Sequence, residues 1–195
     1  MSQNLRVKSS EFIDETHRIS FKFDGKTYYG FKGDTLASAL IANNVHLVGR
    51  SFKYHRPRGI MTSGSEEPNA IVQVNPNSNI TEPNARATEI EIYEGLEASS
   101  QNCWPSVNFD IGGINNFLAP LFPAGFYYKT FMWPKSFWEK YEFFIRHSAG
   151  LGKSPTNRDP DIYDHRNIHC DVLVVGAGIS GILAAKNAAK NNFKT

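Results

Sequence analysis

The sequence predicts an α+β fold in three parts. Two runs of alternating apolar residues, joined by Asp24-Gly25, predict a β-hairpin near the N-terminus. Aromatic residues and prolines crowd the middle of the chain and predict an irregular connector. A short apolar run before a glycine-rich turn predicts a strand that leads into a helix near the C-terminus. We expect the first part to span residues 1–95, the connector 96–168 and the last part 169–195.

The N-terminal part is expected to follow the order ββαββ. The hairpin strands lie in Arg18–Phe23 and Thr27–Phe31, and Gly33-Asp34-Thr35 offers N-cap chemistry for a helix over Leu36–Ala42. Ala70–Val74 is typical of a buried strand, and Thr88–Ile92 alternates like a half-buried one. This order predicts a β-grasp domain that ends near Gly95.

The connector contains one regular element. Phe137, Trp138, Tyr141, Phe144 and Ile145 recur at helical spacing, which predicts an amphipathic helix over residues 135–147. The rest of the connector is more typical of a packed core or a subunit interface than of a cofactor site. Its aromatic density indicates packing against something outside this chain.

The C-terminal part has a dinucleotide-binding pattern. Val172–Val175 precedes Gly176-Ala-Gly178-Ile-Ser-Gly181, and an alanine-rich segment follows. In such a unit the first glycine makes the tight turn, the second admits a pyrophosphate, and the third lets the helix pack on the strand. The N–H groups at the start of the helix then receive the phosphates. A tight strand-to-helix connection without a ligand is the alternative.

The same pattern indicates a longer protein. The second strand of the unit, with its ribose-binding acid, is expected about 20 residues beyond the glycines. Here that strand would only begin at Phe193–Thr195. We therefore expect the chain to be the front end of a longer cofactor-using protein, with an incomplete Rossmann unit over residues 169–195.

A cationic loop is the second candidate site. Gly49–Gly59 interleaves Arg50, Lys53, His55 and other cationic residues with two aromatic ones. Arginine offers a planar fork for anions and aromatic rings offer stacking faces, so the loop could contact a phosphate, a flavin or an acidic partner. A solvated loop is the alternative. His55 has no evident carboxylate partner nearby, so we expect it to be exposed and not catalytic.

Composition sets further bounds. Lys plus Arg number 21 and Asp plus Glu 19, which gives little reason to expect a nucleic-acid or membrane partner. Cys103 and Cys170 fit neither a disulfide framework nor a CxxC metal pair, and we expect both to be unreactive. No apolar run approaches the roughly 18 residues of a membrane span. The sequence therefore predicts a cytoplasmic protein.

Several stretches together resemble one enzyme family. Gly33–Leu40, Val48–Gly59 with Glu66–Ala70, and Asp159–Gly178 are similar to the N-terminal part of the alpha subunits of heterotetrameric sarcosine oxidases. The resemblance covers essentially the whole chain. It implies a ferredoxin-like β-grasp domain joined to a Rossmann domain of the FAD/NAD type, and a folate-binding domain later in the subunit.

The resemblance also implies an activity and cofactors. The family oxidatively demethylates sarcosine to glycine, forming peroxide and methylenetetrahydrofolate, with FAD and FMN as electron carriers. Its amine-oxidising flavin site belongs to the beta subunit, and beta, gamma and delta subunits are the implied partners. The alpha subunit would bind NAD at Gly176, Gly178 and Gly181, with Ile179 and Ser180 as backbone donors, and would share FMN with the beta subunit.

Related dehydrogenase subunits bind a [2Fe-2S] cluster in this domain. A plant-type cluster needs C-x4-C-x2-C and a distant fourth cysteine. Because residues 49–70 contain no cysteine, we expect a cluster-free domain and no metal site. Two other functions remain open: a subunit of another ferredoxin-fused amine or opine dehydrogenase, and a noncatalytic β-grasp interaction module. In each case the chain by itself is expected to be inactive, and no catalytic residue is assigned to it.

Overall fold

The computed structural model describes residues 3, 5–7, 12–75, 80–121, 125, 133–149 and 152–195. The chain divides into two compact units, of which the first ends at Asp159 and the second begins at Pro160. Each unit is described by itself.

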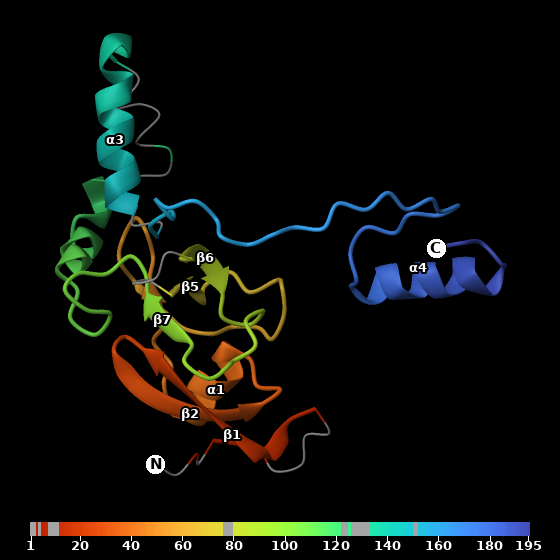
Figure 1. The fold of residues 1–195 in the computed structure, drawn as a ribbon. Helices are drawn as coiled ribbons and strands as arrows, with labels where there is room; N and C mark the ends of the chain where they lie inside the picture. Colours follow the sequence, from red (N-terminus) through yellow and green to blue (C-terminus); the bar gives the residue numbers. More distant parts are fainter. Residues whose placement is uncertain are drawn as a thin grey trace. The chain divides into compact units, whose positions relative to one another are not determined.

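A five-stranded mixed sheet is the centre of the first unit (Figure 1). Its strands are β1 (Asp14–Phe23), β2 (Lys26–Lys32), β5 (Ile71–Val74), β6 (Glu82–Arg86) and β7 (Glu97–Ser100), and their order in the sheet is β2-β1-β7-β5-β6. β1 and β7 run parallel, and the other neighbours are antiparallel. The sheet therefore joins the first strand of the chain directly to the last strand of the unit.

The predicted hairpin is present. β1 and β2 pair with Phe23 opposite Lys26. Asp24 and Gly25 both have positive φ, 49° and 75°, as a two-residue turn between antiparallel strands requires. Phe21 and Phe23 from β1 are buried, so the alternating pattern does mark the core face of this strand.

The predicted helix is also present and begins as the sequence indicates. α1 (Leu36–Ala42) is N-capped by Thr35, whose side chain accepts a hydrogen bond from the Ser38 N–H. The helix lies beside β2 (Figure 1), and the side chains of its apolar face are buried. Leu36 and Leu40 are fully buried and form part of one core cluster with Phe21, Val72 and Leu96.

The predicted strand over Thr88–Ile92 is wrong. This segment is a turn followed by a single bridge between Glu91 and Thr35. Its backbone is used at the start of α1: the Leu36 N–H donates to Ile90 O at 2.7 Å, and the Ala37 N–H donates to Ala87 O at 2.9 Å. The segment therefore satisfies helix N-terminal donors instead of joining the sheet.

β7 is a strand of the sheet that the sequence analysis did not predict. Its sequence is Glu-Ala-Ser-Ser, and Ala98 is its buried apolar residue. It pairs with both β1 and β5, and it lies beyond the predicted domain end at residue 95.

The connector begins with short 3-10 helices. η1 (Ile111–Asn116) and η2 (Ala119–Leu121) precede η3 (Lys135–Phe137), which leads into α3 (Trp138–Ala149). The helix predicted over residues 135–147 therefore exists, with its first turn in the 3-10 form. Residues 122–124 and 126–132 of the predicted aromatic connector lie outside the described residues.

The second unit contains one helix, α4 (Ile179–Lys190), within the described residues. The predicted strand Val172–Val175 has no assigned sheet partner there, so it is not a strand by hydrogen bonding. The Asp171 and Val172 N–H groups instead donate to Lys194 O at 2.8 and 3.2 Å. Among the described residues, no helix has the length and apolar character needed to cross a membrane.

Candidate functional site

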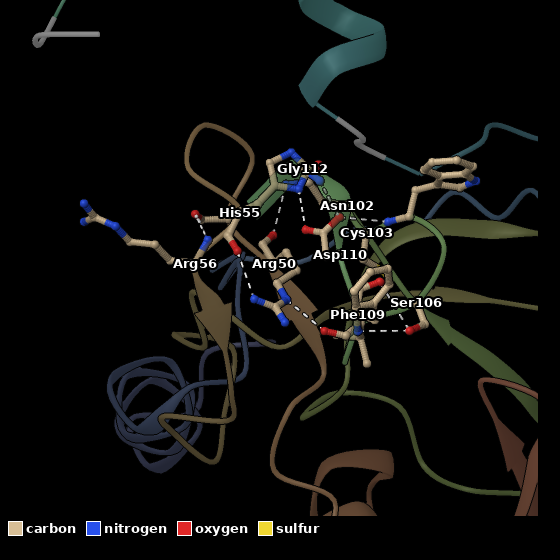
Figure 2. Close-up of polar contacts among 12 residues, drawn as sticks. Arg50, His55, Arg56, Asn102, Cys103, Ser106, Phe109, Asp110 and Gly112 are labelled. Carbon is tan, nitrogen blue, oxygen red and sulfur yellow. Dashed lines mark hydrogen bonds and ion pairs between the residues drawn. The ribbon is translucent and has the colours of Figure 1, made fainter. Parts of the chain in front are cut away.

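The cationic loop forms a small hairpin. β3 (Gly49–Arg50) pairs with β4 (Pro57–Arg58), and the Ser51 N–H donates to Arg56 O at 3.0 Å. His55 turns the chain with a φ of 52°. The hairpin lies against residues 102–116, and polar contacts join the two segments (Figure 2).

A short polar contact between His55 and Asp110 is the centre of these contacts. His55 Nδ1 lies 2.6 Å from Asp110 Oδ2, and the two side chains are only 13% and 1% exposed. The other carboxylate oxygen of Asp110 accepts hydrogen bonds from the Trp104 N–H at 3.0 Å and the Gly112 N–H at 3.1 Å. The expectation of an exposed, unpaired His55 is therefore wrong, because its partner lies 55 residues away in the sequence.

Gly112 allows this close approach. A Cβ atom at this position would lie 2.3 Å from the His55 ring, much closer than atoms can pack. The neighbouring Gly113 has open space around its own Cβ position. The Gly112-Gly113 pair therefore contains one glycine that the packing requires and one that it does not.

Arg50 provides a second connection. Its Nε donates to Val107 O at 2.8 Å, and its Nη1 donates to His55 O at 3.2 Å. The backbone O of Arg50 accepts from Asn102 Nδ2 at 3.1 Å. Two segments distant in sequence, the β3–β4 hairpin and residues 102–110, are thus held together by the Arg50 guanidinium and the His55–Asp110 contact (Figure 2).

The remaining cationic residues face outward. Arg56 and Arg58 are exposed, and Arg56 Nε donates to Asn116 Oδ1 at 2.9 Å. The Tyr54 ring lies between Lys53 Nζ at 4.8 Å and the Arg56 guanidinium at 4.6 Å. Arg50 and His55 therefore have structural roles within the loop, whereas Arg56 and Arg58 are exposed.

An open pocket of ≈250 Å³ lies beside the hairpin. Arg58, Phe52 and Ile71 contribute to its lining, together with the buried Gln101. Gln101 Nε2 donates to Gln73 Oε1 at 3.4 Å, and Gln101 Oε1 has no hydrogen-bond partner among the described residues. The pocket thus combines cationic and apolar side chains.

A buried carboxylate organises the segment that follows the hairpin. Glu67 is 1% exposed, and its Oε2 accepts from the Met61 and Thr62 N–H groups at 2.8 and 2.6 Å. Its Oε1 accepts from the Asn69 and Ala70 N–H groups at 2.7 and 3.1 Å. Burial by itself would raise the pKa of Glu67, but the four backbone donors outweigh it and hold the pKa below its ordinary value. The carboxylate therefore stays ionised and closes the 61–70 loop around itself.

Cys103 has no activating group. Burial raises the pKa of its thiol, and its Sγ lies 3.3 Å from Ser100 Oγ. A raised pKa leaves the thiol protonated near neutral pH, and the thiolate is the reactive form. These observations agree with the prediction of an unreactive packing residue.

The glycine turn of the second unit has the expected local geometry. Gly176 has a φ of 102°, and Gly178 is the N-cap of α4, so the helix begins at Ile179 as the pattern requires. A Cβ at Gly181 would lie 2.0 Å from Gly176 O, which explains why the third glycine is needed where the helix crosses the turn. The Ile179 and Ser180 N–H groups are in the first turn, where no helix carbonyl is available to them.

Comparisons with known proteins agree with these observations. Residues 16–103 match a family described as a 2Fe-2S iron-sulfur cluster binding domain. The chain is 56% identical over 188 residues to the sarcosine oxidase subunit alpha of Rhizobium meliloti (strain 1021), and this match covers 96% of the chain. It is 30% and 32% identical to the sarcosine oxidase subunits alpha of Corynebacterium sp. strains U-96 and P-1, over 100% and 93% of its length.

The chain is a homologue of sarcosine oxidase alpha subunits. It spans 19%, 16% and 14% of the lengths of these three relatives. Among solved structures it is similar to an L-proline dehydrogenase from P. horikoshii, with 24% identity and a TM-score of 0.37. That likeness covers 47% of this chain and 16% of the other, and it is too low to establish a shared fold.

The family match corrects the predicted cofactors of this alpha-subunit homologue. We expected NAD, a shared FMN and no iron-sulfur cluster, but the N-terminal domain matches a family that is described by its binding of such a cluster. The absence of cysteines in residues 49–70 was therefore an insufficient reason to expect a cluster-free domain.

The residues present do not fit a cluster with four thiolate ligands. Cys103 is the one cysteine within residues 16–103. In the described part of the chain, no group of three or more His, Cys, Asp or Glu side chains could hold a metal ion.

Proposed function

We propose that this chain is the N-terminal part of the alpha subunit of a sarcosine oxidase complex. The complex is a flavin-dependent oxidoreductase that demethylates sarcosine to glycine and forms peroxide and methylenetetrahydrofolate. The observation that carries this proposal is the 56% identity over 96% of the chain to a sarcosine oxidase alpha subunit. The chain itself supplies no catalytic residue in this proposal, and the amine is oxidised elsewhere in the complex.

The glycine turn is proposed to bind the pyrophosphate of a dinucleotide as the start of a Rossmann domain. Gly176, Gly178 and Gly181 would let the phosphates approach, and the Ile179 and Ser180 N–H groups would donate to them. The positive φ of Gly176, the helix start at Ile179 and the contact between Lys194 O and Asp171 N–H support this role. The last contact is consistent with a second strand that begins beside Asp171.

These roles correspond to three proposed parts of the chain. The β-grasp domain is proposed to extend beyond the expected end at residue 95 to include β7, with the connector running from there to residue 168 and residues 169–195 as the first βα unit of the Rossmann domain. The beta, gamma and delta subunits of the complex are the proposed partners. A cytoplasmic location stays a prediction from the sequence.

Peroxide formation tests the main proposal. The full-length protein is co-expressed with its partner subunits, and peroxide is measured with sarcosine, proline and an opine as substrates. We expect peroxide with sarcosine, and none from a preparation that lacks this subunit. A complex that oxidises an opine or proline instead would favour the other ferredoxin-fused dehydrogenases. An assembled complex that oxidises none of these amines would favour an interaction module.

The dinucleotide proposal has its own test. A Cβ at Gly178 meets no atom within 4 Å, so Gly178→Asp fits the fold, and an acidic N-cap suits a helix. Its charge would repel a phosphate at that position. We expect the full-length variant to lose bound dinucleotide, measured after denaturation. Gly113→Asp, at another glycine with open space, is the control and should keep it. Equal dinucleotide contents in the two variants would contradict the proposal.

A further inference from the structure

A row of apolar side chains is exposed on η1. Ile111, Ile114 and Phe117 are three residues apart, and they are 49%, 62% and 83% exposed. Side chains at this spacing eclipse one another on a 3-10 helix, and the Phe117 N–H continues the pattern by donating to Ile114 O at 3.0 Å. Leu121, 71% exposed, follows in η2. These four residues are called the apolar ridge below.

Contacts with the β3–β4 hairpin hold the ridge in place. Asp110 caps the start of η1 through the Gly112 N–H and contacts the partly buried His55. At the other end of η1, Asn116 accepts a hydrogen bond from Arg56 at 2.9 Å. Because both ends of η1 are attached to the β3–β4 hairpin, little ordering is needed when the ridge binds a partner. Such preorganisation favours affinity.

The surroundings of the ridge are cationic. Arg56 contacts the residue just before Phe117, and Arg58 and Lys53 lie on the same hairpin. Residues 35–65 contain no Asp or Glu. Asp110, the acid nearest to the ridge in sequence, is 1% exposed and paired with His55. The ridge therefore presents large apolar side chains with exposed positive charge at one end.

We propose that the apolar ridge docks into an apolar groove with a carboxylate rim on another subunit of the complex. This inference rests on the proposed function, which places the chain in a multi-subunit enzyme. Charge decides against a second copy of the chain: an isologous contact through this face would bring the cationic hairpins of both copies together. An acidic rim neutralises the hairpin instead. Phe117 is the expected anchor, since aromatic residues dominate binding energy at interface centres.

Photo-crosslinking identifies the occupant directly. p-Benzoylphenylalanine replaces Phe117 in the full-length subunit within the assembled complex, and the irradiated product is mapped by mass spectrometry. We expect a crosslink to another subunit, in a segment that contains Asp or Glu. A crosslink confined to the same polypeptide or to a second copy of it would overturn the proposal, and so would the absence of any crosslink.

Substitution of Phe117 measures how much the ridge contributes to binding of the partner subunit. We expect Phe117→Ser to weaken binding of the partner subunit by about tenfold or more, as loss of an interface anchor does. Ile162→Ser, at a 97% exposed residue of the second unit, is the matched control and should leave binding unchanged. Equal affinities for the two variants would refute the role of the ridge. If the wild-type complex oxidises sarcosine but Phe117 yields no crosslink, the inference fails and the proposed function stands. If the crosslinked complex oxidises no sarcosine, the function fails and the interface stands.

Discussion

The carboxylate of Glu67 offers the sharpest test of how the 61–70 loop is held. Glu67→Gln keeps the shape of the side chain but replaces one acceptor oxygen by an NH₂ group. The remaining oxygen can serve one pair of backbone donors, either Met61 and Thr62 or Asn69 and Ala70. The other two N–H groups then face an NH₂ group and lose their acceptor.

The expected cost follows from that count. A buried donor left without a partner costs about 1–3 kcal/mol, so two such donors cost about 2–6 kcal/mol. Domains are commonly stable by only about 5–15 kcal/mol. With a urea m-value of about 2 kcal/mol/M, the unfolding midpoint should fall by roughly 1–3 M. Glu66→Gln makes the same chemical change at an exposed neighbour and should stay within about 0.5 kcal/mol.

Urea unfolding, followed by far-ultraviolet circular dichroism at neutral and acidic pH, measures both variants. The pKa of Glu67 is lowered in the folded state from an ordinary value of 4.5. The stability due to its ionised form is therefore fully present above that value and is lost as the pH falls towards the folded pKa. The difference between wild type and Glu67→Gln should shrink below about pH 4.5. If Glu67→Gln and Glu66→Gln unfold at the same urea concentration at pH 7, the carboxylate does not organise the loop.

Two further predictions concern the same unit. Gly112→Ala should lower the free energy of unfolding by about 1–3 kcal/mol, because the new Cβ overlaps the His55 ring, whereas Gly113→Ala should be nearly neutral in thermal melts; equal melting temperatures would show that the His55 contact is not tight. Arg6 binds Asp34 through two hydrogen bonds of 3.1 and 2.5 Å, and Asp34 is fully buried. Arg6→Met should therefore cost about 3 kcal/mol in urea unfolding, because the buried carboxylate keeps only the neutral donors Phe31 N–H and Ser38 Oγ, and a loss under 1 kcal/mol would contradict this pairing.

Local signals in the sequence predicted the elements that local chemistry decides. The Asp24-Gly25 turn permits positive φ at both positions, and Thr35 caps α1 with its own side chain. The glycines at 176, 178 and 181 likewise act within a few residues of one another. In each case the determining contacts lie within one turn of the chain, so the pattern is sufficient.

Contacts between residues far apart in the sequence could not be predicted from local patterns. The alternation of Thr88–Ile92 resembles a strand, yet Ile90 O within it and Ala87 O just before it accept hydrogen bonds from the start of α1. β7 is too polar to be recognised, and it joins the sheet because β1 and β5 offer it edges on both sides. Asp110 two residues before a glycine is a cap signal for η1, but nothing in the sequence connects it to His55.

The sequence by itself therefore determined the hairpin, the first helix, the glycine turn and the composition of the cationic loop, because each depends on neighbouring residues. Tertiary structure alone decided which cations of that loop are internal and which are exposed. Arg50 and His55 differ from Arg56 and Arg58 only in the carbonyl and carboxylate groups that folding brings to them. Polar side chains are tolerated in the interior where partners satisfy them, and the Val107 carbonyl and the Asp110 carboxylate come from residues more than 50 positions away.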